Sequence, residues 1–168
     1  MEDQAVMFDA CSRKDLEASY FLHIDTVYRV CYMYFKKKTQ DVEDAVQTTF
    51  LKRIVYTRPF ENREHEKAWL IRTASNVCKD MLKRKERRNI STEGMELPDT
   101  NSEATSDEIF EYVMTLPDKY RLAMYLFYYE EYTCRQIAQI MKKSEGSIWN
   151  YLHFGRKQVK AMIQGEIR

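Results

Sequence analysis

The chain has 168 residues, of which 44% are hydrophobic and 32% charged, and its net charge is +1. This length suffices for one ordinary domain or two small ones, and no apolar run reaches the roughly 20 residues of a membrane span. The acidic start of the chain, Met1 to Gln4, differs from the basic start of a signal peptide, so we expect a cytoplasmic protein. The cysteines lie far apart, which favours separate thiols over zinc or disulfide chemistry: Cys11, Cys31, Cys78 and Cys134.

The near-zero total charge hides an uneven distribution along the chain. Residues 1–19 carry −3, residues 20–88 carry +7, residues 89–108 carry −6 and residues 109–168 carry +3. Two basic blocks separated by an acidic one favour two modules that bind an anionic partner.

Residues 18–88 show the apolar spacing of three helices. The first contains Tyr20, Ile24, Val27, Tyr28, Cys31 and Phe35. The second, Asp41 to Tyr56, is expected to turn inward Val42, Ala45, Val46, Phe50 and Ile54, with acidic residues in the first turn that suit the helix dipole. Breaks at Pro59 and Asn62 precede the third, from about Glu66 to Arg88, which is expected to bury some of Trp69, Leu70, Ala74, Val77 and Met81.

The third predicted helix ends in a basic run, Lys83-Arg84-Lys85-Glu86-Arg87-Arg88. One or two cations at a helix C-terminus are explained by the helix dipole. Five of six residues exceed that need, which favours contact with nucleic-acid phosphates over a solvated helix end.

An acidic strip over residues 89–106 is poor in aromatics and rich in Ser, Thr and Asn, so it lacks the apolar surface needed to offset its ordering entropy. We interpret it as a linker between two domains, since unstructured loops of this length are uncommon within compact domains. A short helix from Asp107 to Thr115 follows, and Pro117 is well placed as the first residue of the next helix.

Two helix-start signals lie eleven residues apart near the C-terminus. Thr133 and Gln136 have capping-box spacing, and Ser144 can accept from the backbone N–H of Gly146 or Ser147. The first helix has an apolar face, and the second repeats apolar residues with Gly155 permitting close approach. The pattern predicts a helix-turn-helix, which places its second helix in the DNA major groove, although an αα-hairpin without a DNA role fits the same pattern.

Three segments and the helix-turn-helix carry a family resemblance. Asp41-Val42-Glu43-Asp44-Ala45-Val46-Gln47-Thr48-Thr49-Phe50 resembles a D-x-E-D-x-x-Q-x-x-F segment, and residues 68–80 resemble an A-W-L-x-x-I-A-x-N-x-x-x-D helix with a basic tail. Residues 116–121 resemble the L-P-x-x-x-R start that precedes the helix-turn-helix. In this order, with an acidic linker between the second and third, they resemble the extracytoplasmic-function (ECF) sigma factors of bacterial RNA polymerase.

The resemblance implies an all-α fold of two small helical domains joined by a flexible acidic linker. The implied division is an N-terminal extension over 1–17, region two over 18–88, the linker over 89–107 and region four over 108–168. Core RNA polymerase and promoter DNA are the implied partners, an anti-sigma protein is a further candidate, and no cofactor or metal is implied. The implied place is the cytoplasm, in association with the nucleoid.

The resemblance also assigns site residues. The polymerase clamp is expected to bind Asp41, Glu43, Asp44 and Gln47. The minus-ten promoter element, where an unstacked base must be trapped, is expected to meet Phe60, Asn62, His65, Lys67, Arg72, Asn76, Lys79, Lys83, Arg84, Arg87 and Arg88. The minus-thirty-five element is expected to meet Arg135, Ser144, Ser147, Trp149, Asn150, His153, Arg156, Lys157 and Lys160.

The second helix of the helix-turn-helix departs from the family pattern G-T-V-K-S-R-L-H-R-A-R, because Trp149, Tyr151 and Phe154 stand at three of its basic positions. Fewer cations imply weaker DNA binding with a flatter salt dependence. Three explanations are open, of which we favour the first two together: an unusual promoter sequence contacted by aromatic rings, weak binding compensated by polymerase avidity, or a protein-binding surface. Thr73 and Ser75 likewise replace the usual Ile and Arg of the family.

The leading hypothesis is therefore a non-enzymatic initiation factor that directs promoter recognition, DNA melting and transcription initiation. The alternative is a stand-alone helix-turn-helix regulator that acts without entering the holoenzyme. An enzyme has little support, because His23, His65 and His153 lack metal-ligand spacing and no nucleophile–base set or phosphate loop is present.

Overall fold

The computed structural model describes the backbone of residues 2–36, 38–88 and 106–165, with side chains from Arg13 onward except at 106 and 107. These residues form seven α-helices and contain no strand. The helices fall into two compact units, Met1–Arg84 and Lys85–Arg168. The fold class expected from the sequence is thus confirmed, whereas the predicted linker lies almost entirely outside the described residues.

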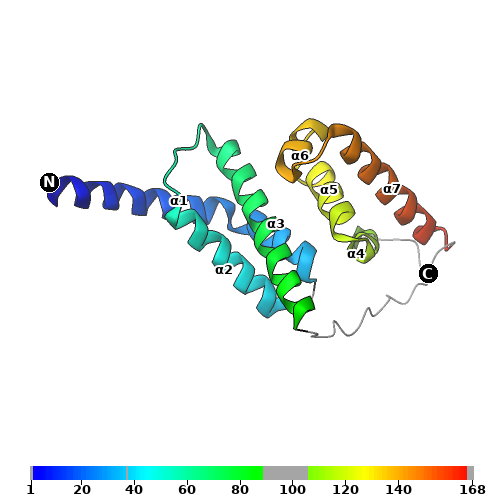
Figure 1. Ribbon diagram of the computed structural model, residues 1–168. Coiled ribbons are helices and arrows are strands. Elements are labelled where there is room, and N and C mark those ends of the chain that lie inside the picture. The colour runs from blue at the N-terminus through cyan, green and yellow to red at the C-terminus, as the bar shows by residue number, and fades with distance from the viewer. Residues whose placement is uncertain (1, 37, 89–105, 166–168) are drawn as a thin grey trace. The chain divides into compact units, whose positions relative to one another are not determined.

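Three helices form the N-terminal unit: α1 (Glu2–Phe35), α2 (Thr39–Val55) and α3 (Arg63–Arg87). The C-terminal half of α1 packs along α2, and α3 lies beside them (Figure 1). The core between the three helices is apolar, and its fully buried members include Val27, Val30, Cys31, Val42, Ala45, Leu70, Ile71, Ala74 and Cys78. Burying the valine, leucine and isoleucine side chains among them contributes about 1.5–3 kcal/mol each, which holds this small bundle together.

Two boundaries in this unit differ from the sequence prediction. Helix α2 begins at Thr39, so that only Asp41 of the acidic residues lies in its first turn. Helix α3 begins at Arg63 rather than Glu66, because Asn62 caps it through a hydrogen bond described below. The predicted break at Pro59 and Asn62 is confirmed as the connection between α2 and α3.

The C-terminal unit contains α4 (Ser106–Thr115), α5 (Asp118–Tyr128), α6 (Cys134–Met141) and α7 (Glu145–Ile163). Helix α7 packs against the other three (Figure 1). Pro117 is the N-cap of α5, one residue before the predicted position. Arg121 is 3% exposed, forms an ion pair with Asp118 and donates to the Met114 carbonyl, so this motif arginine joins the α4–α5 corner.

The helix-turn-helix is formed by α6 and α7. The Gln136 N–H donates to Thr133 Oγ1 at 3.2 Å, and the Thr133 N–H donates to Gln136 Oε1 at 2.9 Å, which is the predicted capping box. The Ser147 N–H donates to Ser144 Oγ at 3.1 Å and caps α7. Between the two helices Lys142 adopts φ 53°, a left-handed C-cap that is sterically costly for a residue with a side chain.

Gly155 lets α5 and α7 approach closely. A Cβ atom at this position would lie 2.4 Å from Met124 Sδ and 3.1 Å from Met124 Cγ. Both residues are buried in the contact between the two helices. The sequence prediction that Gly155 permits close approach is therefore confirmed.

Candidate nucleic-acid interfaces and a helical docking face

One side of α2 exposes a polar stripe. Glu43, Asp44 and Gln47 are exposed, Asp41 is half-buried, and Gln40 Nε2 donates to Asp44 Oδ1 at 3.0 Å. Four of these residues are the ones that the sequence assigns to the polymerase clamp, and Gln40 is their neighbour. Phe50 faces the core instead, as expected. The stripe is therefore available to a helical partner with basic side chains.

Apolar side chains continue this stripe toward the end of α2, and the sequence did not predict them as a surface. Leu51, Ile54 and Val55 are 57%, 56% and 75% exposed. Ile54 was expected to face inward, and that prediction is wrong. Arg53 takes the inward position, where its side chain is only 14% exposed because it pairs with Glu66 of α3.

The loop between α2 and α3 is held by an aromatic cluster. Phe60 stacks on Tyr56 with ring centroids 5.1 Å apart, and both rings contact Trp69 of α3, at 5.7 and 4.5 Å. The His65 ring meets the edge of Phe60 at 5.4 Å. Phe60 is half-buried as a result, so the loop has a defined shape in the free protein.

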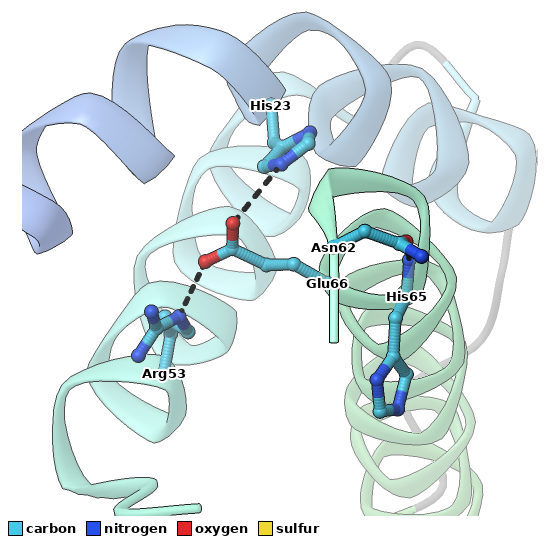
Figure 2. A network of polar contacts seen from close by, with 5 residues as sticks. All are labelled: His23, Arg53, Asn62, His65 and Glu66. Atoms are coloured by element: carbon cyan, nitrogen blue, oxygen red, sulfur yellow. Dashed lines mark hydrogen bonds and ion pairs between the residues drawn. The ribbon is translucent and has the colours of Figure 1, made fainter. Parts of the chain in front are cut away.

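Asn62 and His65 both cap α3 (Figure 2). The His65 N–H donates to Asn62 Oδ1 at 2.8 Å, and the Glu61 N–H donates to His65 Nδ1 at 3.2 Å. Because Nδ1 accepts, the neutral imidazole carries its proton on Nε2. Both side chains are exposed, so they lie at the surface assigned to the minus-ten element, but part of their hydrogen-bonding capacity serves the helix start.

Glu66 lies between His23 and Arg53 and joins all three helices of the unit (Figure 2). Its Oε1 accepts from Arg53 Nε at 2.8 Å, and its Oε2 lies 3.4 Å from His23 Nε2. Burial raises the pKa of Glu66, but the nearby Ser19 hydroxyl and the hydrogen bond and charge of Arg53 outweigh it, so the pKa is lowered. Burial lowers the pKa of His23 despite the nearby Glu66 carboxylate.

We expect acidification to destabilise the N-terminal unit in two stages. Below the ordinary His23 pKa of 6.5 the unfolded chain binds a proton more readily than the folded one, so the free energy of unfolding falls as the pH falls. Below the ordinary Glu66 pKa of 4.5 the unfolded chain again binds a proton more readily, so the free energy of unfolding falls a second time. Urea unfolding at several pH values should show this trend. His23→Gln should flatten the first stage alone, and an unchanged pH profile in that variant would contradict the assignment.

An open cavity of 310 Å³ lies between α2 and α3. It is lined by Lys52, Trp69, Thr73, Asn76, Val77 and Asp80. An indole ring, an exposed amide and an ammonium group in one cavity suit a planar heterocycle with a phosphate attached on the Lys52 side, while Asp80 adds an anionic group to the same lining. Of these residues the sequence had assigned only Asn76 to DNA, and Lys52 lies on the helix that it assigned to the polymerase.

Basic side chains lie on α3 before, among and after the cavity residues in the sequence. Lys67 and Arg72 are half-buried and interact with other groups of the protein. The remaining predicted cations are exposed toward the end of the helix: Lys79, Lys83, Arg84, Arg87 and Arg88. The cavity and the cationic end therefore share one helix, so that a nucleic-acid strand bound along it would meet both.

Helix α7 exposes a stripe that suits the major groove. Along it lie Trp149, Asn150, His153, Lys157 and Lys160, with exposed Arg135 on α6. Ser144 and Ser147 share the cap of α7 and bond to each other at 2.9 Å. Arg156 is tied to its own unit, since its Nε donates to Tyr128 Oη and its guanidinium lies 5.6 Å from the Phe127 and Tyr128 ring centroids.

Two of the three unusual aromatics of α7 point back to α5. The Tyr120 ring lies 4.4 Å from that of Phe154 and 5.4 Å from that of Tyr151, with Lys119 Nζ over Tyr120 and Tyr151. Trp149 is 58% exposed and takes no part in this cluster. Internal packing thus accounts for Tyr151 and Phe154, and Trp149 is the aromatic residue left for an external contact.

Within residues 13–36, 38–88 and 108–165, no group of three or more His, Cys, Asp or Glu side chains is arranged to hold a metal ion. No helix among the described residues is long and apolar enough to cross a membrane. Cys31 and Cys78 are buried free thiols, and Cys134 is a half-buried one.

Comparison with known families divides the chain at the same acidic strip. Residues 20–88 match the model of sigma-70 region 2, and residues 106–159 match that of sigma-70 region 4. The chain therefore belongs to the sigma-70 family.

Individual relatives define the group within that family. The chain is 25% identical over 161 residues to the ECF RNA polymerase sigma factor SigW of Bacillus subtilis, covering 85% of this chain and 86% of the relative. It is 28% identical over 155 residues to SigM of the same organism, covering 88% and 94%. It is thus an ECF sigma factor, which functions in promoter recognition and transcription initiation with core RNA polymerase and promoter DNA as partners.

A solved structure shares the fold. The sigma factor RpoE of Bartonella quintana, crystallised in complex with the anti-sigma factor NepR, has a TM-score of 0.67 and 18% identity to this chain. The match covers 92% of this chain and 99% of that one. At this identity the similarity concerns the fold.

Proposed function

We propose that this sigma factor is a non-enzymatic cytoplasmic protein that binds core polymerase through α2, opens promoter DNA along α3 and recognises an upstream element with α7. Residues 18–88 would then serve the polymerase and the minus-ten element, and residues 108–168 the minus-thirty-five element. Residues 89–107 would be the linker between them. The observation that carries the proposal is the cavity beside Trp69 and Asn76, which lies on the same helix as the exposed cationic end of α3.

The cavity supports a role in melting. An opened promoter presents unstacked bases, and capture of such a base compensates for an unstacking cost of a few kcal/mol. The Trp69 ring offers a stacking surface, the Asn76 amide can bond a base edge, and Lys52 can contact a phosphate. The Tyr56–Phe60–Trp69 contacts keep one wall of the cavity in place.

Transcription reconstituted with core polymerase tests the proposal directly. We expect promoter-dependent transcripts from genomic fragments only when the protein and core enzyme are both present. Tight operator binding by the free protein, without promoter-dependent transcripts, would instead support a stand-alone helix-turn-helix regulator. Mapped start sites would also reveal the two promoter elements.

Loss of the basic end of α3 should weaken promoter binding. In an Arg84→Glu, Arg87→Glu double variant, two phosphate contacts are removed, so the slope of log affinity against log salt should fall by about 2. Transcription initiation should fall together with promoter affinity, and transcript yield across a salt titration measures both effects. Arg13→Glu, Lys14→Glu is a matched control, because both residues are exposed on α1. Equal salt slopes in the two variants would show that the basic end of α3 is not part of the DNA-binding surface.

An anti-sigma protein is a candidate regulator. The related RpoE structure contains one, and here the stripe on α2 and its apolar end remain open to a partner. Such a protein would inhibit by covering the surface that we assign to the polymerase.

A further inference from the structure

Glu66 is more enclosed than a residue in the first turn of a surface helix usually is. Its side chain is 12% exposed, and the side chains of Arg53 and His23 around it are 14% and 5% exposed. An ion pair this deep has a desolvation cost that often cancels its Coulombic gain, so stability alone explains it poorly. A role in positioning other groups is a reason to retain it.

Arg53 contacts two partners with different parts of its guanidinium. Its Nε donates to Glu66 Oε1 at 2.8 Å, and its Cζ lies 4.9 Å from the centroid of the Phe60 ring. The planar group can satisfy both because hydrogen bonds lie in its plane and the ring contact uses its face. Glu66 therefore determines which way the guanidinium faces and so where it meets Phe60.

We propose that Glu66 is a positioning residue for promoter opening: through Arg53 it holds Phe60 and the 56–62 loop in their bound shape before DNA arrives. This inference rests on the proposed function of the loop and cavity. The chain of contacts runs from Glu66 to Arg53, then to Phe60, and from Phe60 to Tyr56 and Trp69 at the cavity. It also connects α2, the polymerase-docking helix, to the loop.

A preformed loop lowers the cost of binding. Ordering one released side chain costs about 0.5–1.5 kcal/mol, so loss of the positioning contact should reduce promoter opening by up to about tenfold. The effect should appear in opening rather than in polymerase binding, because the stripe on α2 faces away from Arg53.

Two substitutions separate positioning from simple stability. Arg53→Lys keeps a cation beside Glu66 but removes the flat group over Phe60. Glu66→Gln keeps the shape of the side chain and removes its charge. Their matched controls are Arg63→Lys and Glu64→Gln, since both residues are exposed in the first turn of α3, outside the 56–62 loop.

The first measurement needs neither polymerase nor DNA. The chain has two tryptophans, so in a full-length Trp149→Phe background the fluorescence of Trp69 reports the cluster alone. We expect acrylamide quenching of Trp69 to rise about twofold in Arg53→Lys and Glu66→Gln, and to stay unchanged in both controls. Unchanged quenching in folded Arg53→Lys protein would overturn the proposal, and would do so even if the proposed function were correct.

The second measurement uses chains with the native Trp149 and compares a duplex promoter with one already unpaired at the minus-ten element. In the two variants we expect core-polymerase affinity within twofold of wild type, with slower opening of the duplex and a smaller defect on the unpaired template. Equal losses on both templates together with weaker polymerase binding would indicate general destabilisation and overturn the proposal. Absence of transcription by the wild-type protein would instead contradict the proposed function.

Discussion

Replacing Gly155 by valine is expected to lower the free energy of unfolding of the C-terminal unit by about 1–3 kcal/mol, the usual cost of overpacking a core. The new Cβ would lie 2.4 Å from Met124 Sδ, and Leu116 Cδ1 is 3.7 Å away on another side. Met124 is 8% exposed and so has little room to move aside. A core in a unit of this size rarely supplies more than about 3–5 kcal/mol, so much of its stability would be lost.

Thermal or urea unfolding followed by circular dichroism measures this effect. Gly146→Val is a matched control on the same helix, since a Cβ there meets nothing nearer than Ser144 Oγ at 3.9 Å. Met124→Ala added to Gly155→Val should recover a large part of the loss by emptying the space that the valine needs. Equal stabilities for the two valine variants would show that α5 and α7 do not need their close approach.

Reversing the charge of Asp44 is expected to weaken binding to core polymerase on the order of 30-fold, which corresponds to a contact worth about 2 kcal/mol. Asp44 lies in the middle of the exposed stripe on α2, and a lysine there would face a basic clamp surface with like charge. The folded state should be unaffected, because the carboxylate is exposed and its hydrogen bond comes from neighbouring Gln40.

Competition for core polymerase against a labelled wild-type chain measures that loss. Asp25→Lys is the matched control, since it makes the same change on an exposed position of α1 in the same unit. We expect the control to compete like wild type. If the two variants compete equally well, the stripe on α2 is not the polymerase-docking face.

Local signals made the helix-turn-helix predictable from sequence. The capping box at Thr133 and Gln136 joins residues three apart, and the cap between Ser144 and Ser147 has the same spacing. Hydrogen bonds over one turn depend on local sequence and need no knowledge of distant packing. The close helix–helix approach at Gly155 was likewise predictable, because a glycine at a core position of a helix indicates such a contact.

Long-range contacts decided what the sequence left open or missed. The apolar spacing of α2 predicted that Ile54 faces the core. Instead Arg53 occupies the inward position, because it pairs with Glu66, which lies thirteen residues after Arg53 in the sequence. In the same way Tyr120 of α5 packs against Tyr151 and Phe154, for which comparison with the family pattern had left an external contact open. The residues assigned to DNA and polymerase remain predictions, and the structure sharpens them to the cavity on α3 and the stripes on α2 and α7.

The pairing of Glu66 with Arg53 also has an evolutionary consequence. Loss of either member leaves an enclosed charge without its partner, at a cost of about 3–5 kcal/mol, whereas exchange of both for apolar residues is close to neutral. Positions 53 and 66 are therefore expected to change together in descent. Among homologous chains, an apolar residue at position 66 should accompany an uncharged residue at position 53, and this covariation would show when the ion pair arose.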